Sequence, residues 1–138
     1  MTSDLLISFG FGWMVVAALI GLYLGAKHEG HIEQLRSAAA SGSLPEYHRI
    51  FEAYKWRSSV HAHGMLFSLS SIGVGSVLSH DGLSKAFHSV ELLIGTLIVA
   101  TVVWTLAAVW RVRPLMGLAD LLFIGVMVGV AVSVAGTL

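Results

Sequence analysis

Histidine is the residue type with the most chemistry available to it in this sequence. The chain has 138 residues, seven histidines and no cysteine. Without cysteine it has no thiolate metal site, disulfide or thiol nucleophile, so histidine, carboxylate or methionine must hold any metal or cofactor. Five histidines lie in or beside the one sizeable polar segment, residues 26–59: His28, His31, His48, His61 and His63. Chemistry is therefore expected around this segment.

The sharpest pattern in the chain follows His61. Steps of three and four residues from His61 lead along one helix face to small residues only: Gly64, Ser68, Ser71 and Gly75. Steps back from His61 lead on the same face to Arg57 and then Tyr54. The face of His63 instead carries larger residues, among them Phe67 and Val74. A shallow trough is therefore expected beside His61 and not beside His63.

Two interpretations of this trough stay open. Small residues at a helix interface in lipid let two backbones approach, so the stripe is typical of helix packing in a non-catalytic membrane subunit. A trough beside a histidine also suits a flat cofactor. Haem b would lie against Gly64 and Ser68, take its axial ligand from His61 and present its propionates to Arg57, on the face that also carries Tyr54. Such a haem would act as a Lewis acid on a small apolar substrate, pass an electron or sense a gas.

A divalent metal ion in the polar segment is the third interpretation. His28 and His31 are three residues apart and can share a helix face. The other ligands would come from one of His61 and His63 and from one of Glu29 and Glu52. This set suits zinc, copper or non-haem iron. His61 and His63 are rotated by about 200° on a helix, so they cannot bind one ion together. A solvated charged hairpin explains the same residues without a metal.

The composition places these residues in a membrane protein. Hydrophobic residues make up 56% of the chain and charged residues 12%, and the mean hydropathy is +0.81, whereas a soluble domain carries about 25% charged residues. Four apolar stretches are long enough to cross a bilayer: residues 5–25, 60–78, 90–110 and 115–138. We expect one domain over residues 1–138, an all-α integral membrane four-helix bundle in contact with lipid. Eight basic and eight acidic residues give no indication of nucleic acid as a partner.

The polar segment predicts a hairpin that extends the first two helices, because its charges recur at helical spacing. Its break is expected at residues 41–46, where Ser43 is a plausible N-cap with Glu46 as its capping-box partner. Pro45 suits the first turn of the second helix, which should begin near Leu44.

The basic residues predict the orientation of the chain. Seven lie in the first and third connections, Lys27, Arg36, Arg49, Lys55, Arg57, Arg111 and Arg113, against Lys85 on the opposite side with His80 and His88. By the positive-inside rule the hairpin is cytoplasmic and both termini are outside, as in a bacterial inner membrane. Trp56, Trp104 and Trp110 are expected near the interface on the hairpin side, as belt and packing residues. GxxxG pairs at residues 21–25 and 125–129 predict close packing within the bundle or between subunits.

The start of the second apolar stretch resembles two haem-protein arrangements. Its sequence is Trp56-Arg57-Ser58-Ser59-Val60-His61-Ala62-His63-Gly64. One similar arrangement is the second helix of haem-copper oxidase catalytic subunits, where an arginine-rich start precedes a haem-ligating histidine. The other is the small four-helix styrene oxide isomerase family, whose fold resembles that of the membrane-associated eicosanoid and glutathione enzymes. Those isomerases are trimers that hold haem b between subunits through one histidine near the start of helix two.

Carried over by position, the resemblance implies that His61 is the axial ligand, with His63 as the alternative, and that Arg57 binds a propionate. It also implies a homotrimer. The chain departs from the isomerase pattern, because Phe67 stands where a polar residue should assist the substrate and residues 90–110 contain no tyrosine. The resemblance therefore implies haem more strongly than epoxide isomerisation, and enzyme activity stays open.

Overall fold

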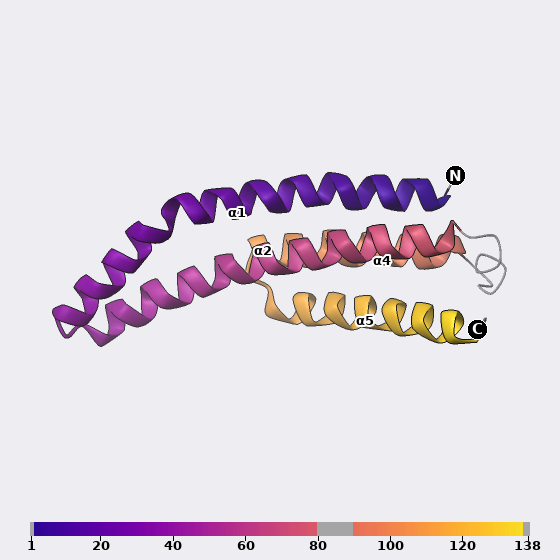
Figure 1. The fold of residues 1–138 in the computed structure, drawn as a ribbon. Helices are drawn as coiled ribbons and strands as arrows, with labels where there is room; N and C mark the ends of the chain where they lie inside the picture. Colours follow the sequence, from indigo (N-terminus) through magenta and orange to yellow (C-terminus); the bar gives the residue numbers. More distant parts are fainter. Residues whose placement is uncertain (1, 80–89, 137–138) are drawn as a thin grey trace.

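The computed structural model describes residues 2–79 and 90–136, and the regular structure within these residues is α-helical. The helices labelled in Figure 1 are α1 (Thr2–Ala40), α2 (Leu44–Leu78), α4 (Val90–Val109) and α5 (Arg113–Ala135). The prediction of an all-α four-helix bundle is confirmed, including the extension of the first two helices through the polar segment. The predictions that involve His80, Lys85 and His88 fall outside the described residues.

The turn between α1 and α2 begins α2 where the sequence predicts. Gly42 has a φ of +68°, a left-handed conformation that glycine adopts without strain. Ser43 is the N-cap residue of α2, and Pro45 lies in the first turn. The predicted capping box is wrong, because the Ser43 side chain makes no capping hydrogen bond and both carboxylate oxygens of Glu46 bind Arg49 instead.

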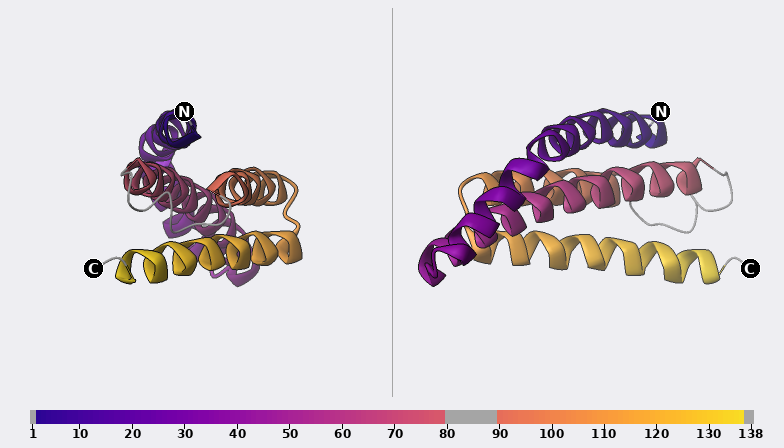
Figure 2. Two further views of the ribbon diagram at one scale, coloured as in Figure 1. Left: turned by 90° about the vertical axis from the view of Figure 1, so that its right-hand side faces the viewer. Right: turned by 60° about the vertical axis from the view of Figure 1, so that its left-hand side comes forward.

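The helices pair as two antiparallel hairpins. α1 packs along α2 and α4 along α5, with fewer contacts between the two pairs. Figures 1 and 2 show the connection between α1 and α2 projecting beyond the turn between α4 and α5, at the same end of the molecule. The start of α1 and the end of α5 lie at the other end. The prediction that the first and third connections share one side is therefore confirmed.

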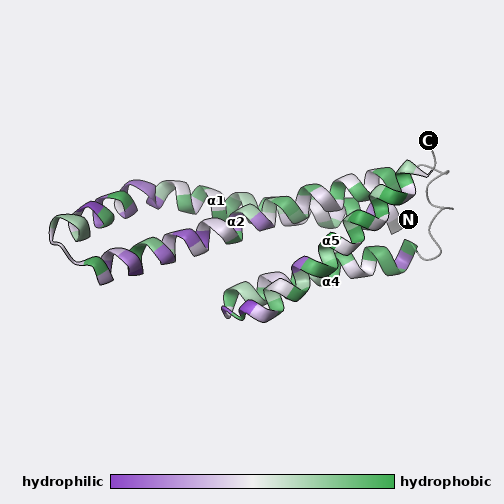
Figure 3. Ribbon diagram, turned by 90° about the horizontal axis from the view of Figure 1, so that it is seen from below, coloured by the Kyte–Doolittle hydropathy of each residue, from purple (hydrophilic) through white to green (hydrophobic). Residues whose placement is uncertain are grey.

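Three of the described helices are long and apolar enough to cross a membrane: α1, α4 and α5. They expose large apolar side chains such as Leu22, which is 72% exposed. Figure 3 shows hydrophobic residues along the bundle and hydrophilic ones gathered in the α1–α2 hairpin. Residues 60–78, the second of the four predicted spans, are less apolar than these three helices because they contain histidines, glycines and serines. α2 nevertheless runs beside the other helices (Figure 1), so protein must shield its polar groups.

Aromatic rings join α2, α4 and α5 in the core. Buried Phe67 of α2 meets Trp104 of α4 edge-on, with ring centroids 5.7 Å apart, and Phe123 of α5 at 4.8 Å. Such pairs contribute about 0.5–1.5 kcal/mol each beyond the burial of area. Trp104 is 1% exposed, so of the two predicted roles it has the packing role, because its side of α4 faces α2.

Candidate functional site

His61 is held by α1 through one hydrogen bond and one close contact. Its Nδ1–H donates to the carbonyl oxygen of Ala17 at 2.9 Å. Its ring lies so close to Gly21 that a Cβ there would be 2.5 Å from the His61 Cε1 atom. A carbonyl only accepts hydrogen bonds, so Nδ1 carries a proton, and in the neutral imidazole Nε2 then carries the lone pair. Among the described residues nothing forms a hydrogen bond with Nε2. His61 therefore presents an oriented, unpaired nitrogen ligand.

The small-residue stripe of α2 is covered by α1. Ser68 and Ser71 are fully buried. A Cβ on Gly64 would lie 3.2 Å from the Cβ atom of Ala17, and a Cβ on Gly75 would also meet α1, at 2.6 Å. The stripe is thus a helix-packing surface within one chain. In this arrangement α1 occupies the trough beside Gly64 and Ser68, the place where haem is expected from the sequence.

His63 points away from α1, as its spacing from His61 predicts. Its ring stacks on Trp104, with centroids 4.4 Å apart and an interplanar angle of 14°. Its Nδ1–H donates to the carbonyl oxygen of Ser59 at 2.9 Å, one turn back on α2. The two histidines therefore lie on opposite sides of α2, His61 against α1 and His63 against α4.

An exposed polar cluster joins α1 and α2 through the Tyr54 ring. The Tyr54 hydroxyl lies 3.1 Å from Nδ1 of His28, and the His31 ring meets Tyr54 edge-on at 5.5 Å. Arg57 donates a hydrogen bond of 3.5 Å to Nε2 of His31. The prediction that His28 and His31 share a face is confirmed, because both meet Tyr54.

The predicted divalent metal site is not assembled around this cluster. Over residues 2–79 and 90–136, no three histidine or carboxylate side chains lie close enough to hold an ion together. A guanidinium group occupies the neighbourhood of His31, and His61 and His63 are bonded to backbone elsewhere. The spacing of His28 and His31 predicted a shared face correctly, but it carried no information on which further side chains would reach them.

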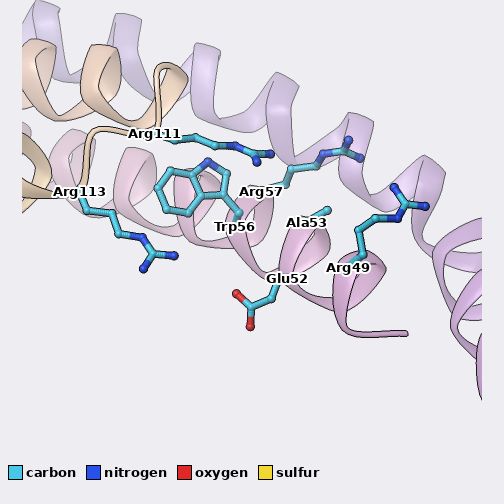
Figure 4. Close-up of a pocket in the computed structure, with 7 residues that line it drawn as sticks. All are labelled: Arg49, Glu52, Ala53, Trp56, Arg57, Arg111 and Arg113. Atoms are coloured by element: carbon cyan, nitrogen blue, oxygen red, sulfur yellow. The ribbon is translucent and has the colours of Figure 1, made fainter. Parts of the chain in front are cut away.

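Four arginines line one opening between α2 and the turn that joins α4 to α5. We call it the arginine pocket. Its volume is about 450 Å³, and its lining residues, drawn in Figure 4, are Arg49, Glu52, Ala53, Trp56, Arg57, Arg111 and Arg113. The guanidinium carbon of Arg111 lies 6.0 Å from the centroid of the Trp56 ring, at the limit of a cation–π contact. Charge asymmetry placed these residues on one side, but sequence reasoning did not join them into a site.

Arg49 differs from the other arginines of the pocket because it has a carboxylate partner. Its Nε donates to Glu46 at 2.9 Å, and its Nη2 donates to the other carboxylate oxygen. These hydrogen bonds lower the pKa of Glu46 below its usual value. In the described part of the chain, no ion pair joins a carboxylate to Arg57, Arg111 or Arg113.

An apolar groove adjoins the arginine pocket. It has a volume of about 340 Å³ and shares Trp56, Arg57 and Arg111 with the pocket. Its other lining residues come from α1, α2 and α4 and are mainly aliphatic: Ile20, Tyr23, Leu24, Val60, Ala108 and Val109. Cationic and hydrocarbon surfaces therefore meet at Trp56.

Two features of the described residues bear on function. One is His61, with Nε2 unpaired and Nδ1 fixed by α1. The other is the arginine pocket with its adjoining apolar groove. No protein-family model, no curated protein and no solved structure matches this chain, so its function is inferred from these residues.

Proposed function

We propose that the protein is an integral membrane protein that binds haem b, with His61 as the axial ligand. One observation carries the proposal: the Nδ1–H of His61 is fixed on the Ala17 carbonyl, which leaves Nε2 for a metal. Metal-ligating histidines commonly donate their other ring N–H to a carbonyl or carboxylate, which orients the ring and raises its basicity. Haem iron commonly takes a proximal histidine.

The surroundings of His61 favour haem over a bare divalent ion. A zinc site takes three or four protein ligands, and the described residues contain no group of three ligand side chains. Haem needs one protein ligand, because the porphyrin supplies four nitrogens. Arg57 lies one turn before His61 and is exposed, so its guanidinium can bind a propionate.

In the described arrangement a single chain offers haem an axial ligand, His61, and a cationic partner for a propionate, Arg57, but no walls for the porphyrin ring. The stripe at Gly64 and Ser68 is closed by α1, so the macrocycle has to lie elsewhere beside the partly buried His61. We assign the remaining walls to lipid and to further copies of the chain, in the homotrimer that the resemblance to styrene oxide isomerases implies. Haem bound there would supply a Lewis acid for a small apolar ligand, an electron carrier or a gas-binding iron.

The proposal is tested by the absorption spectrum of protein purified from cells supplied with haem. We expect a Soret band in the wild type, its loss in His61→Ala and its retention in His63→Ala. His63 is a matched control, because it also has a fixed Nδ1 and no hydrogen bond to Nε2 from the described residues. Added imidazole should restore the band to folded His61→Ala protein by taking the place of the missing side chain.

Two results would count against haem. A colourless wild type after haem supply would favour the non-catalytic membrane subunit, for which the covered stripe of α2 is the supporting observation. A Soret band that survives His61→Ala and disappears in His63→Ala would move the ligand to the α4 side of α2.

We further propose that the α1–α2 hairpin is cytoplasmic, in a bacterial inner membrane, with both termini outside. The basic residues of the hairpin and of the α4–α5 turn lie at one end of the molecule, which supports this orientation. Because the chain has no cysteine, single cysteines report accessibility directly. In intact cells, an impermeant maleimide is expected to label Ser3→Cys and to spare Ser41→Cys. The reverse pattern would place the hairpin outside.

A further inference from the structure

The arginine pocket contains more positive charge than its own residues neutralise. Glu52 is the one carboxylate among its lining residues, and it pairs with Lys55 at 4.0 Å. Arg57, Arg111 and Arg113 form no ion pair with a described carboxylate. Guanidinium groups bind phosphate and carboxylate oxygens in a forked, charge-assisted geometry. The pocket is therefore complementary to an anion.

The position of the pocket specifies the kind of anion. Arg111 and Arg113 flank the turn between α4 and α5, two helices that are long and apolar enough to cross a membrane. Residues at such a turn lie at the depth of the lipid headgroups. Basic pockets between membrane helices at this depth are suited to anionic headgroups. The indole of Trp56, with an apolar body and a polar N–H, is also suited to this layer.

The geometry around Trp56 directs the arginines to both sides of its ring. In Figure 4 Arg111 extends across Trp56 towards Arg57, whereas Arg113 lies on the other side of the indole, the side to which Glu52 also points. Arg111 has a φ of +59°, a left-handed conformation that residues other than glycine rarely adopt. This conformation belongs to the turn that places the Arg111 guanidinium over the ring.

The apolar groove distinguishes a lipid from a small anion. The groove continues from the arginine pocket through Trp56, Arg57 and Arg111 onto the aliphatic side chains of Ile20 and Val60. A ligand that fills both features must carry an anionic group and a hydrocarbon chain. We propose that the arginine pocket binds the phosphate group of an anionic phospholipid, with an acyl chain in the apolar groove. Arg111 and Arg113 define this site, since Arg57 is assigned to a haem propionate.

The proposal is tested with the full chain in phosphatidylcholine vesicles that contain brominated lipid, which quenches tryptophan fluorescence on contact. The signal of Trp56 is the difference between the wild type and Trp56→Phe. Brominated phosphatidylglycerol is expected to reach half-maximal quenching of Trp56 at a lower mole fraction than brominated phosphatidylcholine. Each arginine removed in Arg111→Gln and Arg113→Gln should raise that mole fraction about fivefold.

A matched control removes the same charge elsewhere. Lys27→Gln with Arg36→Gln takes two basic residues from the hairpin that do not line the arginine pocket, and it should leave the preference for phosphatidylglycerol unchanged. Arg111→Lys with Arg113→Lys should recover part of the preference, which separates lost charge from a misfolded turn.

Three outcomes would overturn the proposal. The first is equal quenching of Trp56 by the two lipids. The second is loss of the preference on addition of inorganic phosphate but not of chloride at equal ionic strength, which would identify free phosphate as the ligand. The third concerns the variant that combines Arg111→Gln with Arg113→Gln. If it loses haem and keeps its preference for phosphatidylglycerol, the pocket binds the haem propionates instead.

Discussion

Replacement of Gly10 by alanine is expected to lower the free energy of unfolding by about 2 kcal/mol, the usual scale for overpacking. A Cβ on Gly10 would lie 2.7 Å from Cγ1 of Ile72, 2.9 Å from the carbonyl oxygen of Ser68 and 3.0 Å from the backbone nitrogen of Ile72. Two of these atoms are backbone, so side-chain rotation cannot relieve the clash. α1 would have to move away from α2, with loss of the close packing that holds helices together in lipid.

Gly12 is the matched control for Gly10. It lies two residues further along α1, and a Cβ there would meet nothing within 4 Å. Gly12→Ala should leave stability unchanged or raise it slightly, because alanine favours the helix. The same comparison is available on α2, where Gly75 meets α1 and Gly73 meets nothing within 4 Å. Unfolding by SDS titration, followed by circular dichroism, measures each difference. Equal losses at Gly10 and Gly12 would contradict the observed packing of α1 on α2.

Gly21→Ala is expected to lower haem affinity about 10- to 100-fold, the range found when an outer partner of a metal ligand is lost. The new Cβ would lie 2.5 Å from Cε1 of His61 and 3.0 Å from both ring nitrogens. The imidazole must therefore rotate or withdraw, and its hydrogen bond to the Ala17 carbonyl is lost. This substitution changes the orientation of the proposed ligand without removing it.

Gly25 provides the control one turn further along α1. A Cβ on Gly25 would meet nothing within 4 Å, so Gly25→Ala should keep the affinity of the wild type. Affinity is measured by titration of haem into the apoprotein, followed at the Soret band. Thermal unfolding of both apoproteins separates a local effect on His61 from a general loss of stability. Unchanged haem affinity in Gly21→Ala would show that contact with α1 does not orient the ligand.

The contrast between Gly21 and Gly25 shows how far a motif predicts packing. The GxxxG spacing predicts that both glycines lie in a close contact, but in the described structure only Gly21 meets a neighbour, the His61 ring. The motif identifies a face on which helices can approach. It does not say which turn of that face lies at the point of contact, because this depends on the register of α1 against α2.

Rules that depend on neighbouring residues in the sequence predicted the helix ends well. They failed where a side chain could form a hydrogen bond with either of two partners. The N-cap at Ser43 and the first-turn position of Pro45 were predicted correctly, because both depend on the backbone of the next few residues. The capping box failed because Glu46 binds Arg49, three residues further along the same helix. A charge-assisted, bidentate bond to arginine is stronger than a single bond to a backbone N–H.

The candidate site was predicted in part. The spacing of His61 and His63 correctly placed them on opposite sides of α2. The small residues after His61 correctly marked one continuous face, which α1 covers. The sequence left open whether a cofactor or a helix covers that face. The sequence also did not predict the contact between Arg111 and Trp56. The two residues are 55 positions apart in the chain, and the packing of α2 beside the α4–α5 turn brings them together.

Three properties of this protein can be predicted from its amino-acid sequence alone: an all-α chain with helices long enough to cross a membrane, the position of the turn in the α1–α2 hairpin, and the gathering of the basic residues at one end. These properties depend on hydropathy, on helix capping and on the alternation of spans. Each of these can be read from neighbouring residues or summed along the chain without knowledge of the helix packing. Three further features depend on how the helices pack: α1 covers the small-residue stripe of α2, Trp104 stacks on His63, and the arginines line one pocket. The physical reason is that periodicity defines the faces of a helix but not its partners. Helices such as α4 are apolar on nearly all sides and therefore carry no stripe that specifies a neighbour.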